Sequence, residues 1–239
     1  MLCHRAADTS PPRPLAGVTL IELVVALGLV SVVMAIALPQ FSDWFANQRA
    51  RAAARSVADL FLLARAESIR TGNRHIVYFG NPGATDPSGN PVQKNGAWTP
   101  VLVIDDGPPA TSNCRIDANE AIAGILPEDG LSWGVSFAGA PLASDSGAAA
   151  FDPSGPPVWD GSTFADPTGT KASWVLFRPD GVPVAFTGAV GSCGAIGRLG
   201  SGGGALYITN GERDLGVVLN ALGNVRLHLW VRSAETWSG

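Results

Sequence analysis

One carboxylate inside a long apolar run constrains this chain more than any other feature. From Val18 to Leu38 the only ionisable residue is Glu22. A helix of this length rises about 1.5 Å per residue and matches the roughly 30 Å hydrocarbon core of a bilayer, so the run predicts a membrane-spanning helix over 18–38. A carboxylate at the centre of such a helix costs roughly 2.5–3.5 kcal/mol, and we therefore expect Glu22 to have a partner.

The residues around this carboxylate form a recognisable signal. A basic, polar leader ends at Gly17, and the apolar helix that follows has Glu22 at its fifth position. This pattern resembles the class III signal of type IV pilins and type II secretion pseudopilins, although that family usually has Phe where this chain has Val18. The resemblance implies that prepilin peptidase cleaves between Gly17 and Val18 and that Val18 is N-methylated. It also implies that Glu22 pairs with the Val18 amine of a neighbouring subunit.

Other interpretations of this segment remain open. Ala35-Ile36-Ala37 is a passable cleavage site for an ordinary secretory signal peptide, which would leave a chain starting at Leu38. An uncut single-pass anchor is the other alternative, with Glu22 reaching the membrane interface. Pro39 occupies the position where pilin-like helices often carry a proline that bends the stem, so the resemblance gives it a role in assembly; the simpler interpretation is that Pro39 ends the apolar segment.

The next segment also has helical spacing. Apolar residues from Val57 to Ala64 recur at intervals of three and four, which predicts a helix from Phe41 to about Thr71, capped by Gly72-Asn73. The strings at 47–54 and 63–73 resemble the "N-x-x-R-x-A-A" and "L-A-R-S-E-A-I-x-R-G" patches of the general secretion protein H / FimT family. This second resemblance narrows the class to a minor pseudopilin or a minor pilin.

The composition changes after residue 75. Short apolar runs now alternate with glycine- and proline-rich loops, which is typical of β-strands. The expected strands are Arg74–Phe79, Val101–Ile104, Leu131–Phe137, Ser173–Phe177, Val182–Thr187, Ala205–Thr209, Leu215–Leu219 and Val225–Val231. The predicted fold class is α+β, with a long N-terminal helix, membrane-spanning in its first half, packed on an antiparallel sheet or sandwich head. Its parts are a leader (1–17), a transmembrane helix (18–38), an amphipathic continuation (39–75) and a β-rich periplasmic domain (76–239).

One of the three cysteines lies in the predicted leader and the other two lie in the predicted β-rich domain. Cys3 lies in the leader, so the mature chain would keep Cys114 and Cys193. In an oxidising periplasm an even pair favours a disulfide, and two separate thiols are the alternative.

Enzyme signatures are absent from the sequence. It contains no G-x-S-x-G, H-E-x-x-H or C-x-x-C motif, so we expect no enzyme, no cofactor and no metal. His75 and His228 lie in strand-like sequence and are interpreted as structural. The glycine run at 200–204 precedes a strand and not a helix, so it favours a turn over a phosphate site. The acidic stretch 117–120 lacks the full set of calcium ligands.

Charge is distributed unevenly. Residues 39–75 hold six Arg against three acidic residues, whereas residues 76–239 hold eight basic and fifteen acidic ones. A basic stalk and an acidic head suit docking between filament subunits, and a solvated arginine face is the alternative. In FimT-like proteins DNA binding is linked to a Gly-Arg-x-Arg motif. Here the match is Gly223-Asn224-Val225-Arg226, which lacks the first Arg and leaves Arg226 as a weak candidate contact.

The resemblance implies a function and a location. The first hypothesis is a minor pseudopilin that helps to initiate a type II secretion pseudopilus near its tip; the alternative is a FimT-like minor type IV pilin in pilus biogenesis or DNA uptake. The implied partners are other major and minor pseudopilins or pilins, prepilin peptidase, an inner-membrane assembly platform, and the bilayer before assembly, with DNA disfavoured. The implied location is the inner membrane, single-pass, with the C-terminal domain in the periplasm, and then the filament.

Overall fold

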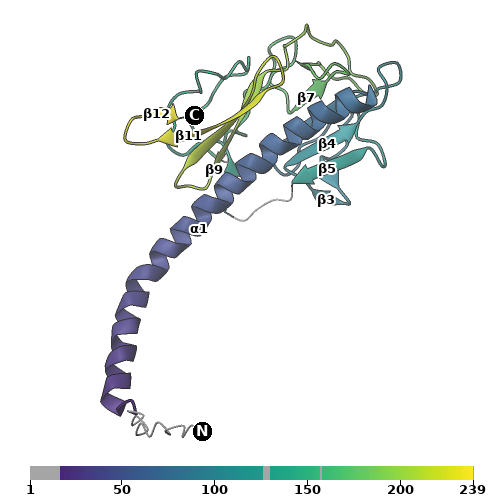
Figure 1. Ribbon diagram of the computed structural model, residues 1–239. Coiled ribbons are helices and arrows are strands. Elements are labelled where there is room, and N and C mark those ends of the chain that lie inside the picture. Colours follow the sequence, from purple (N-terminus) through teal and green to yellow (C-terminus); the bar gives the residue numbers. More distant parts are fainter. Residues whose placement is uncertain (1–16, 126–129, 157, 239) are drawn as a thin grey trace, which may run out of the picture. The chain divides into compact units, whose positions relative to one another are not determined.

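The computed structural model describes residues 17–125, 130–156 and 158–238, without the side chains of residue 36 and residues 38–40 (Figure 1). The chain divides into two compact units, one ending at Trp44 and the other running from Phe45 to Gly239. Helix α1 (Leu20–Thr71) contributes residues to both units.

The first unit corrects the predicted membrane helix. Within the described residues, no helix is both long enough and apolar enough to cross a membrane. Helix α1 carries Glu22 in its first turn and continues past the apolar run to Thr71, and no stretch of its described residues meets both requirements. The predicted transmembrane segment over 18–38 and the single-pass inner-membrane localisation are therefore wrong.

The second unit begins with the amphipathic part of α1. Its apolar stripe is buried at Ala50, Ala54, Val57, Phe61 and Ala64, each no more than 2% exposed. This helical spacing confirms the predicted stripe. The helix ends as predicted at Thr71, where Gly72 takes a left-handed φ of 72° and its N–H donates to the carbonyl of Ser68 at 3.1 Å.

Antiparallel strands make up most of the second unit. One five-stranded sheet has the order β5-β4-β1-β7-β8, a second has the order β12-β11-β10-β9-β6, and β2 and β3 form a two-stranded sheet. The strands are β1 (His75–Phe79), β2 (Gln93–Lys94), β3 (Ala97–Trp98), β4 (Val101–Asp105), β5 (Ala121–Ile125), β6 (Ser132–Trp133), β7 (Trp174–Phe177), β8 (Pro183–Val184), β9 (Gly204–Thr209), β10 (Asp214–Leu219), β11 (Val225–Val231) and β12 (Thr236–Ser238).

The main core lies where α1 meets both five-stranded sheets. Buried residues of the helix share one apolar cluster with residues of β1, β4 and β7 and of β9 and β10, and Figure 1 shows the helix alongside strands of both sheets. Phe164, from the loop before β7, joins the layers: its ring centroid is 5.9 Å from that of Phe61 and 4.9 Å from that of Phe79. Aromatic pairs at these distances add specific packing to the burial of apolar area.

The predicted fold class therefore needs correction. It was a long N-terminal helix, membrane-spanning in its first half, packed on an antiparallel sheet or sandwich head, and the described residues contain no membrane-spanning helix. Three antiparallel sheets dominate the structure instead. The strands after α1 are short, and glycines with positive φ occur in many of the turns that connect them, so the chain reverses often and builds antiparallel pairs.

The predicted strands agree only in part with the structure. The prediction at Val225–Val231 matches β11, and those for β1, β4, β7, β9 and β10 differ by one residue at an end. Leu131–Phe137 and Val182–Thr187 are each reduced to two residues, Ser132–Trp133 and Pro183–Val184. The edge strands β5 and β12 and the small β2–β3 hairpin were not predicted. Each of these four strands has half-exposed or exposed residues and so gives a weak apolar pattern.

Candidate functional site

The predicted cleavage bond lies in exposed, non-helical backbone. Gly17, Val18 and Thr19 precede α1, and all three residues are exposed, Val18 by 71%. A Cβ placed on Gly17 would meet no atom within 4 Å. Both residues of the bond are therefore accessible to a protease. The rest of the leader, residues 1–16 with Cys3, lies outside the described residues.

Glu22 takes part in the capping of α1 by Thr19, which the sequence interpretation missed. Its backbone N–H donates to Oγ1 of Thr19 at 3.2 Å, and the N–H of Leu23 donates to the carbonyl of Thr19 at 3.2 Å. Thr19 is thus the N-cap of α1, and Thr19-x-x-Glu22 has the spacing of a capping box. The carboxylate also lies in the first turn, where it complements the helix dipole. The signal was a threonine three residues before the glutamate.

Pro39 lies inside α1 and does not end it. A helix that continues past Pro39 is compatible both with a role in assembly and with a proline that ends the apolar segment. The side chain of Pro39 lies outside the described residues, so its predicted role in assembly stays a prediction.

Cys114 and Cys193 form a disulfide, which confirms the predicted pair. Both residues are buried, and beside them lies the carboxylate of Asp106, which is 3% exposed. Its Oδ1 accepts the N–H groups of Asn113 at 3.2 Å and Cys114 at 2.9 Å, while Oδ2 lies 4.0 Å from Sγ of Cys193. Burial raises the pKa of Asp106 to about 6, against the opposing effect of these N–H donors.

This buried cluster is structural and not a metal centre. Asp106, Cys114 and Cys193 are the one group of potential metal ligands found among the described residues, but disulfide-bonded sulfurs are not thiolate ligands. Instead, the cluster fixes the loop after β4: the hydroxyl of Tyr78 donates to the carbonyl of Cys114 at 2.8 Å.

The other sequence candidates are satisfied locally. In the acidic stretch 117–120, a carboxylate oxygen of Asp117 pairs with Arg115 at 2.9 Å, and Glu120 accepts the N–H of Asp117 at 3.1 Å. The glycine run 200–204 permits close packing: a Cβ on Gly202 would lie 2.5 Å from the nitrogen of Val184, and one on Gly204 would lie 2.8 Å from the ring of Phe164. These glycines therefore allow the backbone to approach its neighbours closely, which favours a packing role over a phosphate site.

The two histidines occupy different surroundings. His75 is 1% exposed, its Nδ1 has no hydrogen-bond partner among the described residues, and its Nε2 lies 3.9 Å from a carboxylate oxygen of Asp105. Burial lowers the pKa of His75, and it also lowers the pKa of His228 on β11. Nε2 of His228 lies 3.4 Å from the hydroxyl of Ser144. His75 lies in β1 and His228 in β11, so both histidines are in strands, as their sequence context predicted.

Arg226, the weak candidate for a DNA contact, is exposed on β11, where it pairs in register with Val218. Its neighbour Asn224 is engaged elsewhere: Oδ1 of Asn224 and the carbonyl of Gly223 each accept a hydrogen bond from Arg65 at 3.0 Å. The structure thus gives the incomplete motif a local role in joining the β10–β11 turn to α1. No second arginine accompanies Arg226 in the motif.

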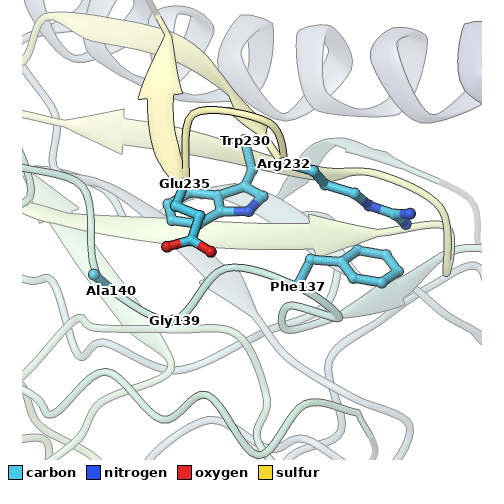
Figure 2. Close-up of a pocket in the computed structure, with 6 residues that line it drawn as sticks. All are labelled: Phe137, Gly139, Ala140, Trp230, Arg232 and Glu235. Carbon is cyan, nitrogen blue, oxygen red and sulfur yellow. The ribbon is translucent and has the colours of Figure 1, made fainter.

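A groove that sequence reasoning missed lies beside the β11–β12 hairpin. It has a volume of about 550 Å³ and is lined by Phe137, Gly139, Ala140, Trp230, Arg232 and Glu235 (Figure 2). Arg232 and Glu235 belong to the hairpin turn, and Phe137 to Ala140 belong to the loop after β6. The indole N–H of Trp237 donates to the carbonyl of Ala140 at 2.9 Å and holds the loop against the hairpin. The sequence offered no motif for this groove, since its lining comes from two segments that are far apart in the chain.

Comparisons with known proteins find no matching family model, no matching curated protein and no matching solved structure.

Proposed function

We propose that this chain is a structural subunit of a pilin-like filament, of the minor pseudopilin type, and that prepilin peptidase cleaves it between Gly17 and Val18. The observation that carries the proposal is local. An exposed, non-helical Gly17–Thr19 segment leads directly into a helix whose first turn contains the only carboxylate of the apolar run. A peptidase needs that accessible backbone, and a filament needs the helix that follows it.

The apolar helix surface supports assembly with other subunits. In the first unit, large apolar side chains from Val18 to Met34 are each more than half exposed. An apolar surface of this extent is characteristic of a surface that other chains cover. Glu22 lies within it, and after cleavage its carboxylate would stand one helical turn from the new amine at Val18. Pairing with the amine of a neighbouring subunit would neutralise both charges when the surface is covered.

Mass spectrometry of the processed protein tests the cleavage. The full-length chain is co-expressed with a prepilin peptidase, and its N-terminus is then sequenced. We expect a mature chain that starts at Val18 and carries one additional methyl group. Gly17→Leu should block the cleavage, and Gly28→Ala is the matched control, because Gly28 lies in the same apolar run and a Cβ there would meet no atom within 4 Å. A start at Leu38, or an intact Met1, would contradict the proposal.

A second experiment separates assembly from helix capping at Glu22. Glu22→Gln removes the charge but leaves the backbone N–H that bonds Thr19, whereas Thr19→Val removes the side-chain cap and keeps the charge. We expect Glu22→Gln to be cleaved normally but depleted from sheared filaments, and Thr19→Val to be incorporated. Incorporation of Glu22→Gln at the wild-type level would disprove the proposed pairing.

A further inference from the structure

The groove beside the β11–β12 hairpin has charges of opposite sign at its two ends. Figure 2 shows Trp230 between Glu235 on one side and Arg232 with Phe137 on the other. Trp230 is 9% exposed, so the groove presents part of its indole between the two charges. A surface arranged in this way is complementary to a partner that carries a cation and an anion a short distance apart.

The positive end is held in place by several contacts. The guanidinium of Arg232 lies 3.1 Å above the ring centroid of Phe137, and its Nη2 donates to the carbonyl of Glu212 at 2.6 Å. The carboxylate of Glu212 lies 3.7 Å away, yet the side chain of Arg232 is still 47% exposed. The guanidinium is therefore positioned before any partner arrives, which lowers the entropy cost of binding an anion.

The negative end occupies a strained position. Glu235 has a φ of 47°, in the left-handed region that costs an L-residue roughly 1 kcal/mol and that hairpin turns usually fill with Gly or Asn. Its carboxylate is in no ion pair with any residue that the structure describes. Glycine would relieve the strain, so the turn alone does not account for a glutamate there. An exposed carboxylate at the mouth of a groove suits a cationic partner.

The chain itself carries a face with matching charges. Arg55 and Asp59 lie on the exposed side of α1, four residues and hence about 6 Å apart along the helix axis. Within the described part of the chain neither side chain has a hydrogen bond or ion pair, with the other or with any residue. Both residues belong to the second unit, as the groove does, so the face and the groove are fixed in the same compact body.

We propose that the groove of one copy of this protein receives the Arg55–Asp59 face of a second copy. Arg55 then approaches Glu235 and the edge of Trp230, and Asp59 approaches Arg232. The contact joins two different surfaces, so it is heterologous and can continue from copy to copy rather than close as a symmetric dimer. The inference does not depend on cleavage, on the apolar helix or on the type of filament.

Charge reversal of the full-length protein tests the contact. We expect Glu235→Arg and Arg55→Glu each to weaken self-association roughly tenfold or more in sedimentation equilibrium at low ionic strength, because each places like charges together. The double variant should restore association, since the two reversed charges again attract. Arg198→Glu is the control for Arg55→Glu: it makes the same change in net charge at another exposed arginine. No rescue in the double variant, or an equal loss in the control, would overturn the proposal.

A further variant distinguishes an effect on stability from an effect on self-association. Glu235→Gly removes the carboxylate and relieves the left-handed strain, so we expect a higher melting temperature together with weaker self-association. A rise in stability with unchanged association would count against Glu235 as a contact.

Cross-linking identifies the partner copy directly. Arg55→Lys keeps the positive charge and supplies an amine that a carbodiimide can join to the carboxylate of Glu235, with loss of water. Equal amounts of ¹⁵N-labelled and unlabelled chains of this variant are mixed, cross-linked and digested, and the linked peptides are analysed by mass spectrometry. We expect links between the introduced amine and Glu235 that combine one labelled and one unlabelled peptide. Links only within one chain, or no link at this pair, would exclude the proposed contact.

Discussion

Arg65 connects α1 to a turn that lies far along the chain. Its Nη1 donates to the carbonyl oxygen of Gly223 and to Oδ1 of Asn224, each at 3.0 Å, across 158 and 159 residues. A Cβ on Gly181, in the turn after β7, would lie 2.6 Å from Ile69 and 3.3 Å from Arg65. Three short segments of the chain therefore meet at one place: the end of the helix, the 178–182 turn and the β10–β11 turn.

The first prediction concerns this arginine. Arg65→Met keeps an extended side chain but removes both hydrogen bonds, so we expect the free energy of unfolding to fall by roughly 1.5–3 kcal/mol, the range for hydrogen bonds with one charged partner. Arg65→Lys, which keeps one cationic donor, should lose less. Urea unfolding of the three proteins provides the measurement, and equal stability of wild type and Arg65→Met would contradict the role given to these bonds.

Gly223 provides a second prediction with an internal control. Gly223 and Gly211 both have left-handed φ values, 80° and 79°, in hairpin turns. A Cβ on Gly223 would lie 2.9 Å from the carbonyl oxygen of Gly181, whereas one on Gly211 would meet no atom within 4 Å. We expect Gly211→Ala to cost roughly 1 kcal/mol from backbone strain, and Gly223→Ala to cost clearly more. Equal melting temperatures of the two variants would show that the close approach at Gly223 does not matter.

What the sequence predicted well was local and strongly patterned. The buried stripe of α1 and the strand at β11 follow from periodicity, and Gly72 marks the end of the helix because it adopts the left-handed cap. The disulfide was predicted from the pair of cysteines that remains when Cys3 is assigned to the leader. The groove was not predictable in this way, because Phe137 and Arg232 come together only through the pairing of strands distant in sequence. The membrane prediction was wrong: it relied on the apolar run of the sequence, and no helix among the described residues is both long enough and apolar enough to cross a membrane.

The disulfide leads to a third prediction. It joins residues 79 positions apart, so in the chain-entropy model its loss costs roughly 4–5 kcal/mol. We expect the double variant Cys114→Ala/Cys193→Ala to unfold at a clearly lower urea concentration than the wild type. Because both sulfurs are buried, the native protein should also resist alkylation after mild reduction unless it is partly unfolded. Rapid alkylation of Cys114 in the native protein would contradict the buried position of this bond.

The carboxylate beside the disulfide leads to a prediction about pH. Burial raises the pKa of Asp106 to about 6 in the folded protein, above its ordinary value of 3.8. Between these two values the folded chain therefore binds more protons at this site than the unfolded chain does. This site should increase the free energy of unfolding as the pH falls from 7 towards 4, by roughly 1–2 kcal/mol after allowance for solvent screening.

The two histidines oppose the effect of Asp106, so the informative quantity is the difference in the free energy of unfolding between wild type and a variant at this site. The lowered pKa values of His75 and His228 act in the opposite direction, because acid protonates these histidines more readily in the unfolded chain. Asp106→Asn can still accept the N–H of Cys114 but does not titrate. We expect the free energy of unfolding of wild type minus that of Asp106→Asn to become more positive from pH 7 to pH 4.5, measured by urea unfolding in buffers of equal ionic strength. A difference that is constant with pH, or that changes with the opposite sign, would show that Asp106 has no raised pKa.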